Sequence, residues 1–464
     1  MHSTSLRVAL LAVVLATAPV AWSKDKKRDA ADSHSSDVAS VWFDKLYDVV
    51  KSEGTSPPPA SRIYGVTAVS LYESIVSGTE EHRSLVGQLN GLRRLPRPQK
   101  GAKYHWPTVA NAALARTIRG IFTSLKAENL AAVNAIEADF DERFEAEVKQ
   151  KVFQRSVAHG HMVADAVLGW CGTDGFGNLN NCPYVPASVA GAWEPTYPLY
   201  NPNPLQPCWG QIRPMVRASG AACRPAGHPE FSTDFGSDFY AAGLEVYNIG
   251  RNLTAEQKTI ARYWADGPGA TGTPPGHWIA IVGQIARKRA LSLAAAAEAY
   301  ARVGIAVHDA FIQCWNAKYL TNGQRPETYI QHTIDAGWLP YLVTPNFPTY
   351  TSGHSTQSGA AATVLTDMFG TKAFTDTTHT DHGLLPPQAP RAFGSFDKAA
   401  DEAALSRLFG GIHFAFDNDD GLASGRCIGR TILRKVSFKE CDDRDDEECD
   451  DGEDDDDDDG DGDD

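Results

Sequence analysis

The chain has 464 residues, of which 42% are hydrophobic and 22% charged, as expected for a globular protein with a sizeable core rather than a disordered or fibrous chain. Its formal net charge is −15, but residues 442–464 hold eighteen Asp or Glu and one Arg, a net of −17, so the remainder is about +2. No basic stripe appears, and we therefore expect no nucleic-acid partner.

The N-terminus has the pattern of a secretory signal peptide over residues 1–23. An apolar run from Val8 to Ala16 is followed by small residues up to Ser23 and then by a basic segment. This run is too short to span a membrane, and no later run of about twenty apolar residues follows. We expect an exported protein, secreted or periplasmic and not integral to a membrane, with a polar linker over residues 24–36 and one domain over residues 37–440.

The body of the chain is predicted to be a mostly α-helical bundle with few strands. Apolar residues recur at spacings of three and four in eight segments, which are residues 41–51, 59–76, 108–125, 127–170, 254–265, 277–319, 355–369 and 399–409. Thr254 and Gln257 predict a capping box, which explains Thr254 better than its place in a glycosylation sequon.

Pro, Gly and Cys are dense between residues 172 and 235, which predicts a long irregular excursion over one end of the bundle. In an exported chain an even number of cysteines favours disulfides, and we expect all eight to be structural. Cys171 with Cys182 and Cys208 with Cys223 are neighbouring pairs in this loop-rich segment, and Cys441 and Cys449 flank an acidic stretch, but the sequence leaves the connectivity open.

Three blocks in the second half of the chain predict a pocket for a tetrahedral oxyanion. Arg325 and Arg407 offer guanidinium forks with two donors each, and Lys318 adds a compact charge. The Asn322–Gly323 step should turn the chain so that Arg325 faces back toward Lys318.

The middle block, Ser352-Gly353-His354, directly precedes a predicted helix. An anion at that helix start would meet free backbone N–H groups and the positive end of the helix dipole. Gly353 permits close approach of the backbone, and the Ser352 hydroxyl adds a donor.

In the last block, Gly410–Gly411 interrupts a helical segment. The break should bring Arg407 and His413 to one centre, which a continuous helix would do poorly at a spacing of six. Asp417, one turn after His413, is placed to fix the tautomer of that histidine.

The C-terminal residues 441–464 form an acidic tail that we expect to be disordered and to favour solubility. Asp459–Asp463 contains hard oxygen ligands without a complete EF-hand loop, so weak calcium binding is the alternative role.

Together the three blocks resemble the signature of vanadium-dependent haloperoxidases and type 2 phosphatidic acid phosphatases (PAP2-like proteins). The resemblance is specific because separate blocks agree in order and internal spacing, with Thr351 standing where many members have proline. It implies the helical fold of the haloperoxidase and acid phosphatase type. The motifs that carry it are concentrated in residues 263–417.

Further residues resemble the long secreted haloperoxidases. Trp315 and Phe347 match aromatic residues on the halide side of chloroperoxidase-type pockets, and by this resemblance Phe347 favours chloride competence, although bromide is easier to oxidise. Residues 263–267 and 273–278 resemble an upstream element in which the aspartate matching Asp266 pairs with the arginine matching Arg407.

The resemblance implies a vanadate cofactor, with phosphate fitting the same site. His413 would ligate vanadium, His354 would be the acid–base group, and Lys318 would polarise the peroxide. Hydrogen peroxide would then oxidise a halide to a hypohalous-acid equivalent that reacts with small organic acceptors. The residues expected to hold the vanadate oxygens are Lys318, Arg325, Ser352, Gly353 and Arg407.

Two other functions remain open on the sequence alone. In a soluble secreted acid phosphatase, His413 would attack phosphorus and His354 would protonate the leaving alcohol. In a secreted binding or mineral-associated protein, the acidic tail would be the functional part. The export pattern favours the haloperoxidase, because the lipid phosphatases with this signature are integral membrane proteins.

Overall fold

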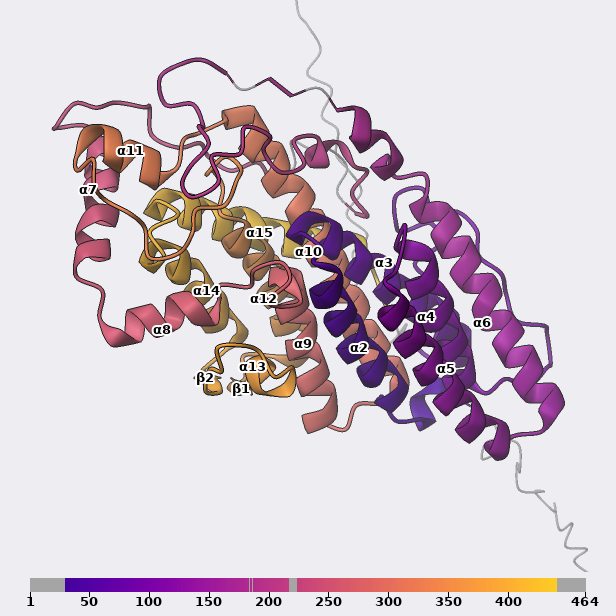
Figure 1. Ribbon diagram of the computed structural model, residues 1–464. Helices are drawn as coiled ribbons and strands as arrows, with labels where there is room; N and C mark the ends of the chain where they lie inside the picture. The colour runs from indigo at the N-terminus through magenta and orange to yellow at the C-terminus, as the bar shows by residue number, and fades with distance from the viewer. Residues whose placement is uncertain (1–29, 183, 186, 217–222, 440–464) are drawn as a thin grey trace, which may run out of the picture.

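The computed structural model of the protein describes residues 30–439, apart from 183, 186 and 217–222. The expected signal peptide, the start of the linker and the acidic tail with Cys441 and Cys449 lie outside the described residues. Within them the fold is mostly α-helical, as the sequence predicted (Figure 1). In this part of the chain no helix has the length and apolar character needed to cross a membrane.

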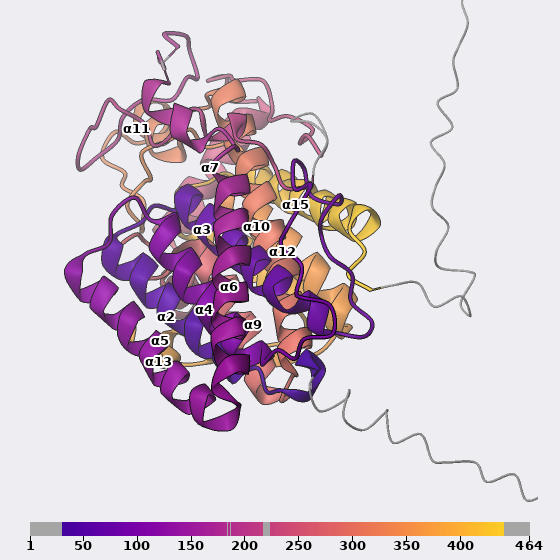
Figure 2. The ribbon, with the colours of Figure 1, turned by 90° about the vertical axis from the view of Figure 1, so that its right-hand side faces the viewer.

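The N-terminal half of the described chain forms one group of packed helices, drawn in indigo and purple in Figure 1. Seen from the side, α5 and α6 form its outer face (Figure 2). Its elements are η1 (Ala31–Ser33), α2 (Asp37–Glu53), α3 (Pro57–Ile75), η2 (Val76–Gly78), α4 (Trp106–Ile121), α5 (Ala127–Glu147) and α6 (Gln150–Cys171).

The long helix α10 (Leu293–Thr321) joins this group to the C-terminal helices. It packs on α3 on one side and on α12 (Gly353–Phe369) on another, with α9 (Thr273–Lys288) beside it. A Cβ on Gly65 of α3 would lie 2.9 Å from the carbonyl oxygen of Gly304 in α10, so the two helices touch through their backbones. Lys318 is therefore carried by a helix that is fixed along its whole length.

The C-terminal half is a second group of helices with a small antiparallel sheet, in which Phe374 pairs with Phe393. The helices α12 and α15 form its most extensive contact. Besides α12, its elements are α7 (Asp238–Arg251), α8 (Ala255–Tyr263), α11 (Pro326–Thr333), β1 (Phe374–Asp376), α13 (Thr378–Asp381), β2 (Arg391–Phe393), α14 (Phe396–Phe409) and α15 (Ala415–Lys435).

Glycines at every fourth position of α15 allow this helix to lie directly on α12. A Cβ on Gly421 would stand 2.8 Å from the Cβ of Ser355, and one on Gly425 would overlap the carbonyl oxygen of Thr356. The close packing brings the start of α12 next to the start of α15, where two of the three sequence blocks meet.

Two helices predicted as continuous are each divided in the structure. Residues 127–170 form α5 and α6, because Val148 and Lys149 adopt extended backbone between them. Residues 277–319 form α9 and α10, because Ala290 has a left-handed φ of 48° and the Ser292 hydroxyl caps α10. The sequence prediction also missed α7, α11 and α15.

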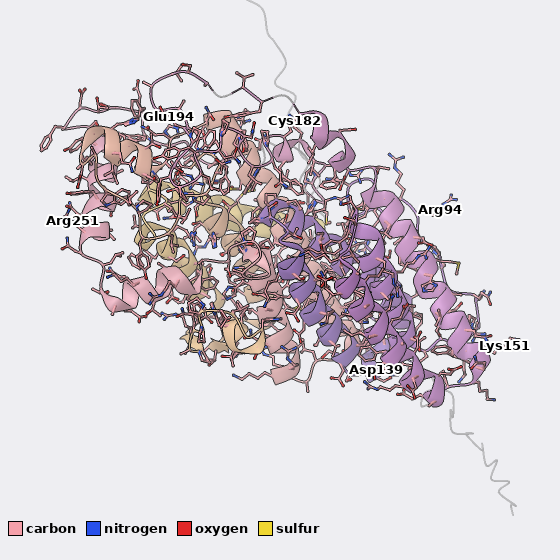
Figure 3. All side chains as sticks on the ribbon, in the orientation of Figure 1. Arg94, Asp139, Lys151, Cys182, Glu194 and Arg251 are labelled. Atoms are coloured by element: carbon pink, nitrogen blue, oxygen red, sulfur yellow. A yellow bond between two sulfur atoms is a disulfide. The ribbon has the colours of Figure 1, made fainter. Side chains whose placement is uncertain are left out.

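Between α6 and α7 the chain is irregular, as predicted, apart from the short turns η3 (Phe176–Asn181) and η4 (Trp209–Gln211). Figure 3 labels Cys182 and Glu194 in this excursion, which runs across one end of the molecule. Trp209 is fully buried and packs with Phe311 and Trp315 of α10. The excursion is thus part of the wall around the end of α10 that carries Lys318.

Disulfides join Cys182 to Cys208 and Cys223 to Cys427. The neighbouring pairs Cys171 with Cys182 and Cys208 with Cys223 are therefore not the bonded ones, since the excursion folds back on itself and then onto α15. Cys171 and Cys314 are free thiols, both buried, so the even number of cysteines did not mean that each has a disulfide partner.

Candidate active site

A cavity of about 680 Å³ lies where the first turn of α12, the end of α14 and several loops meet. Five of the sequence-predicted residues line it with polar groups: Asp266, Gly353, His354, Arg407 and His413. Much of the remaining wall is apolar, and includes Pro204, Leu205, Pro274, Phe311, Trp315, Leu342, Val343, Pro345 and Phe347. One polar centre therefore opens into a largely apolar chamber.

Arg325 is fully buried at the N-cap of α11, where the chain arrives after α10 ends at the left-handed Asn322. Its Nε donates to the carbonyl of Phe347 (2.8 Å) and its Nη1 to the carbonyl of Ile412 (2.8 Å). Nη1 also lies 3.1 Å from His413 Nε2, while Nη2 has no hydrogen-bond partner among the described residues. Burial lowers the pKa of Arg325 to about 9, which still leaves it charged at neutral pH.

Lys318, in the last turn of α10, is also fully buried. Its Nζ donates to the carbonyls of Pro348 (3.0 Å) and Thr349 (2.8 Å), which leaves one of its three N–H groups for another acceptor. The ring of Phe347 lies 5.1 Å from Nζ. Burial lowers the pKa of Lys318 to about 7, and the positive charge of Arg325 acts in the same direction.

Arg407 lies near the end of α14 and is only 4% exposed. Its Nη1 donates to the carbonyl of Trp264 (2.7 Å), and its Nε has no hydrogen-bond partner within the described part of the chain. The expected ion pair with Asp266 is absent from the ion pairs of the described residues. Asp266 Oδ2 lies instead 3.0 Å from Nδ1 of His277 and 3.9 Å from Nε2 of His354.

The break at Gly410–Gly411 brings His413 to the same cavity as Arg407, with Gly411 in the left-handed region at φ 74°. His413 Nδ1 lies 2.9 Å from Asp417 Oδ2, which also accepts from the hydroxyl of Thr349 and the N–H of Phe414. Burial, with the positive charge of Arg325 next, holds the pKa of His413 well below its usual value. A neutral ring that donates from Nδ1 has its lone pair on Nε2, where it now accepts from Arg325 Nη1 and where a metal would bind in exchange for that contact.

His354 occupies the first turn of α12, one residue after Gly353 and two after Ser352, whose hydroxyl caps the helix by accepting from Ser355 N. The backbone of Trp264 lies beside the ring and favours its charged form. Nε2 has no hydrogen-bond partner among the described residues and lies 3.9 Å from Asp266 Oδ2. Burial, then the positive charge of Arg407, keeps the pKa of His354 well below its ordinary value, so the ring is neutral at neutral pH.

The apolar wall is built on aromatic rings from two segments. Trp315 and Phe347 lie with their ring centroids 5.0 Å apart, and Phe311 lies 5.4 Å from Trp315. Sequence reasoning missed Phe311, although its place one helical turn before Trp315 puts both on the same face of α10. It also missed Thr349, whose hydroxyl bonds Asp417 and for which the sequence offers no signal.

Vanadate fits these residues, because three buried nitrogen atoms around the centre lack a hydrogen-bond partner in the described structure. They are Nη2 of Arg325, Nε of Arg407 and Nε2 of His354. Leaving such groups unpaired in a protein interior is costly, and a tetrahedral oxyanion would accept from both guanidinium groups. The lone pair of His413 Nε2, which faces Arg325 Nη1 in this structure, suits a metal that is otherwise bound by oxygen.

A family model of the second helical-bundle domain of VCPO matches residues 298–439, which hold all three sequence blocks. No curated protein matches the chain. Two bacterial vanadium-dependent chloroperoxidase structures share the fold at 16% and 15% identity. The holo form has a TM-score of 0.63, with 83% of this chain and 96% of that chain covered, and the apo form has 0.62, with 82% and 94% covered.

A higher similarity is found to the crystal structure of a bacterial vanadium-dependent iodoperoxidase. The two chains are 34% identical with a TM-score of 0.81, and the alignment covers 88% of this chain and 98% of the other. The chain therefore belongs to the vanadium-dependent haloperoxidases, which are peroxidases with a vanadate cofactor.

Proposed function

We propose that this protein oxidises halide with hydrogen peroxide, iodide most readily, and that the resulting hypohalous-acid equivalent halogenates small electron-rich organic molecules. The observation that carries the proposal is the meeting of Arg325, Arg407, His354 and His413 around one buried centre that opens into an apolar chamber. An anion site in a polar cleft would serve ester hydrolysis equally well, so the apolar wall is the part that favours halide chemistry.

In this proposal His413 ligates vanadium through Nε2, with Asp417 holding the opposite ring nitrogen. The free donors of Arg325 and Arg407 and the third N–H of Lys318 hold the vanadate oxygens. The remaining oxygen contacts come from the Ser352 hydroxyl and the Gly353 N–H at the start of α12. Bound vanadate would supply the Lewis acidity that activates hydrogen peroxide toward a halide.

His354 then takes the peroxide proton. Its ring is neutral and lines the cavity, and its Nε2 has no hydrogen-bond partner among the described residues. Negative charge on the bound anion would favour the imidazolium form and so help the ring to accept the proton. Lys318 polarises the oxygen that is to be transferred, because a bound anion would favour its charged form and burial leaves that charge weakly screened.

The halide side of the site is formed by Phe311, Trp315 and Phe347. Apolar rings remove water from a halide, and iodide loses its hydration more easily than bromide or chloride. Preference for iodide is further supported by the 34% identity to a protein described as an iodoperoxidase. We infer that bromide is a slower substrate and chloride the poorest.

Space for an organic acceptor is supported by the cavity volume of about 680 Å³, which far exceeds that of a halide and a peroxide together. The apolar wall formed by Leu205, Leu342 and Val343 suits an aromatic ring. An extracytoplasmic location, secreted or periplasmic, is supported by the two disulfides and by the N-terminal export pattern.

The decisive experiment measures peroxide-dependent halogenation of a phenol dye with iodide, bromide and chloride in turn, before and after vanadate is added. We expect vanadate-dependent turnover with the highest rate for iodide. His413→Ala should lose vanadate retention, whereas Lys318→Ala should keep the ion and lose turnover. Full activity in either variant contradicts these roles. Release of phosphate from a phosphoester, inhibited by vanadate and without halogenation, would make the protein a phosphatase instead.

A further inference from the structure

Beyond the cavity wall, His277 of α9 lies between two carboxylates. Its Nδ1 is 3.0 Å from Asp266 Oδ2, and its Nε2 is 2.7 Å from Asp376 Oδ2. His277 and Asp376 are fully buried and Asp266 is 3% exposed. Burial opposes charge on the ring, but the two carboxylates outweigh it and raise the pKa of His277 to about 10. An imidazolium therefore sits between two buried negative charges at neutral pH.

The far side of this Asp266–His277–Asp376 cluster is anchored in the fold. Asp376, at the end of β1, accepts from the N–H (2.9 Å) and hydroxyl (2.6 Å) of Thr378 and from Gln284 Nε2 (3.2 Å). These bonds use Oδ1, so Oδ2 is directed to His277. Helix α9, strand β1 and helix α13 thus fix the position of the imidazolium.

The near side of the cluster holds the segment Trp264–Asp266, which follows α8. The Trp264 ring stacks on His277 with centroids 4.4 Å apart and planes 20° apart. Asp266 has a φ of 46°, a left-handed conformation that a non-glycine residue keeps only when its surroundings impose it. Both ends of the segment are therefore fixed by the same imidazole ring.

This segment also holds two residues of the active site. The Trp264 carbonyl accepts from Arg407 Nη1 at 2.7 Å, and the backbone of Trp264 lies close enough to the His354 ring to favour the charged form of that histidine. Asp266 Oδ2 lies 3.9 Å from His354 Nε2. His277 and Asp376 are not among the residues that line the cavity.

We propose that His277 and Asp376 are positioning residues that clamp the segment Trp264–Asp266, and through it fix Arg407 and His354 in their working orientation. Without the imidazolium, Asp266 would be a buried carboxylate that has lost its charged partner, and it would turn toward Arg407. The guanidinium would then leave the Trp264 carbonyl, and His354 would lose its fixed orientation. This inference rests on the roles proposed above for Arg407 and His354.

The test uses the double variant His277→Gln/Asp376→Asn, which removes one positive and one negative charge and so keeps the net charge of the cluster. We expect kcat for iodide oxidation to fall about tenfold or more, because small misplacements of catalytic groups are costly. KM for iodide should change less than about twofold, since Phe311, Trp315 and Phe347 belong to other segments. Orthophosphate should bind the vanadium-free double variant about threefold or more weakly, measured by calorimetry.

His82→Gln is the matched control. His82 has a side chain that is only 6% exposed and is paired with Glu298 (3.1 Å), and Glu298 lies twenty residues before Lys318 on α10, about 30 Å away at 1.5 Å per residue. The proposal is overturned if the double variant and this control have the same kcat and the same phosphate affinity. A wild type without halide turnover would refute the proposed function, while the phosphate comparison would still test the clamp.

A double-mutant cycle separates positioning from general loosening of the fold. In an Asp266→Asn background the double substitution should cause little further loss of kcat, because its effect passes through Asp266. If instead the loss of kcat from Asp266→Asn and the loss from the double substitution multiply, the clamp is refuted. If the double variant does not fold, Asp376→Asn alone is used in the same cycle. The proposal then requires that this substitution reduces kcat at least threefold when Asp266 is present, and does not do so in the Asp266→Asn background.

Discussion

At the scale of single residues, the site depends on one carboxylate that organises the ligand histidine. Asp417 Oδ2 faces His413 Nδ1 and accepts from Thr349 and from the N–H of Phe414, so it fixes which ring nitrogen carries the proton. It lies at the start of α15, where negative charge is also favoured by the helix dipole.

Asp417→Asn should therefore weaken vanadate binding about 10- to 100-fold, the usual cost of losing a partner that orients a metal ligand. Equilibrium dialysis of the vanadium-free protein against vanadate measures the change. Asp420→Asn is the control on the same helix, since Asp420 accepts from the hydroxyl of Tyr350 (2.7 Å) rather than from a ring nitrogen of His413. Equal affinities of the two variants would show that Asp417 does not orient the ligand.

Which residues meet at the site could largely be predicted, because spacing within the three blocks reflects local backbone geometry. The pairing of Asp266 with His277 could not be predicted. Its choice of His277 over Arg407 depends on Asp376, 110 residues further along the chain, and on the stacking of Trp264. Such contacts between distant segments leave no periodicity in a single sequence.

At the scale of helices, the packing of α12 on α15 determines how the Ser-Gly-His block meets the His413 block. The glycines that permit this contact have poor helix propensity, which is why α15 was missed in the sequence while the capped and strongly periodic α8 was found. The breaks between α5 and α6 and between α9 and α10 were missed for another reason. They contain no proline or glycine, and only the dihedral angles reveal them.

Gly425→Ala tests the importance of this helix contact. The added methyl group would overlap the carbonyl oxygen of Thr356, so we expect a loss of about 1–3 kcal/mol in the free energy of unfolding. Vanadate affinity should fall as well, because the two helix starts would separate. Gly169→Ala in α6 is the control, since a methyl group there would meet no atom of the described residues within 4 Å, and it should be neutral or slightly stabilising. Chemical denaturation of both variants measures the two changes in the free energy of unfolding, and equal changes would contradict the argument.

At the scale of the whole molecule, one buried carboxyl group makes stability depend on pH. Glu73 of α3 accepts from the N–H of Leu85 and the hydroxyl of Ser84, but burial outweighs these bonds and raises its pKa to about 7. Because the folded-state pKa lies above the unfolded value, the stabilising contribution is complete below about pH 4.5 and is lost as the pH rises through 7.

Glu73→Gln should remove this part of the pH dependence. Relative to the wild type, the variant should gain up to about 3 kcal/mol in the free energy of unfolding between pH 4.5 and pH 8. Urea denaturation across that range measures the gain, with Glu80→Gln on an exposed loop as the control. A constant difference between variant and wild type at every pH would contradict the argument.

Helix α10 has 29 residues, is about 44 Å long and packs against both groups of helices. Helix α3 contacts it through the backbones of Gly65 and Gly304. The family model begins inside α10, at residue 298, but that boundary is not a place where the molecule divides. Residues 298–439 expressed alone would expose the face that α3 covers, and we expect them to aggregate. Calorimetry of the full chain should accordingly give a single melting transition. Two separate transitions would show that the two groups of helices unfold independently.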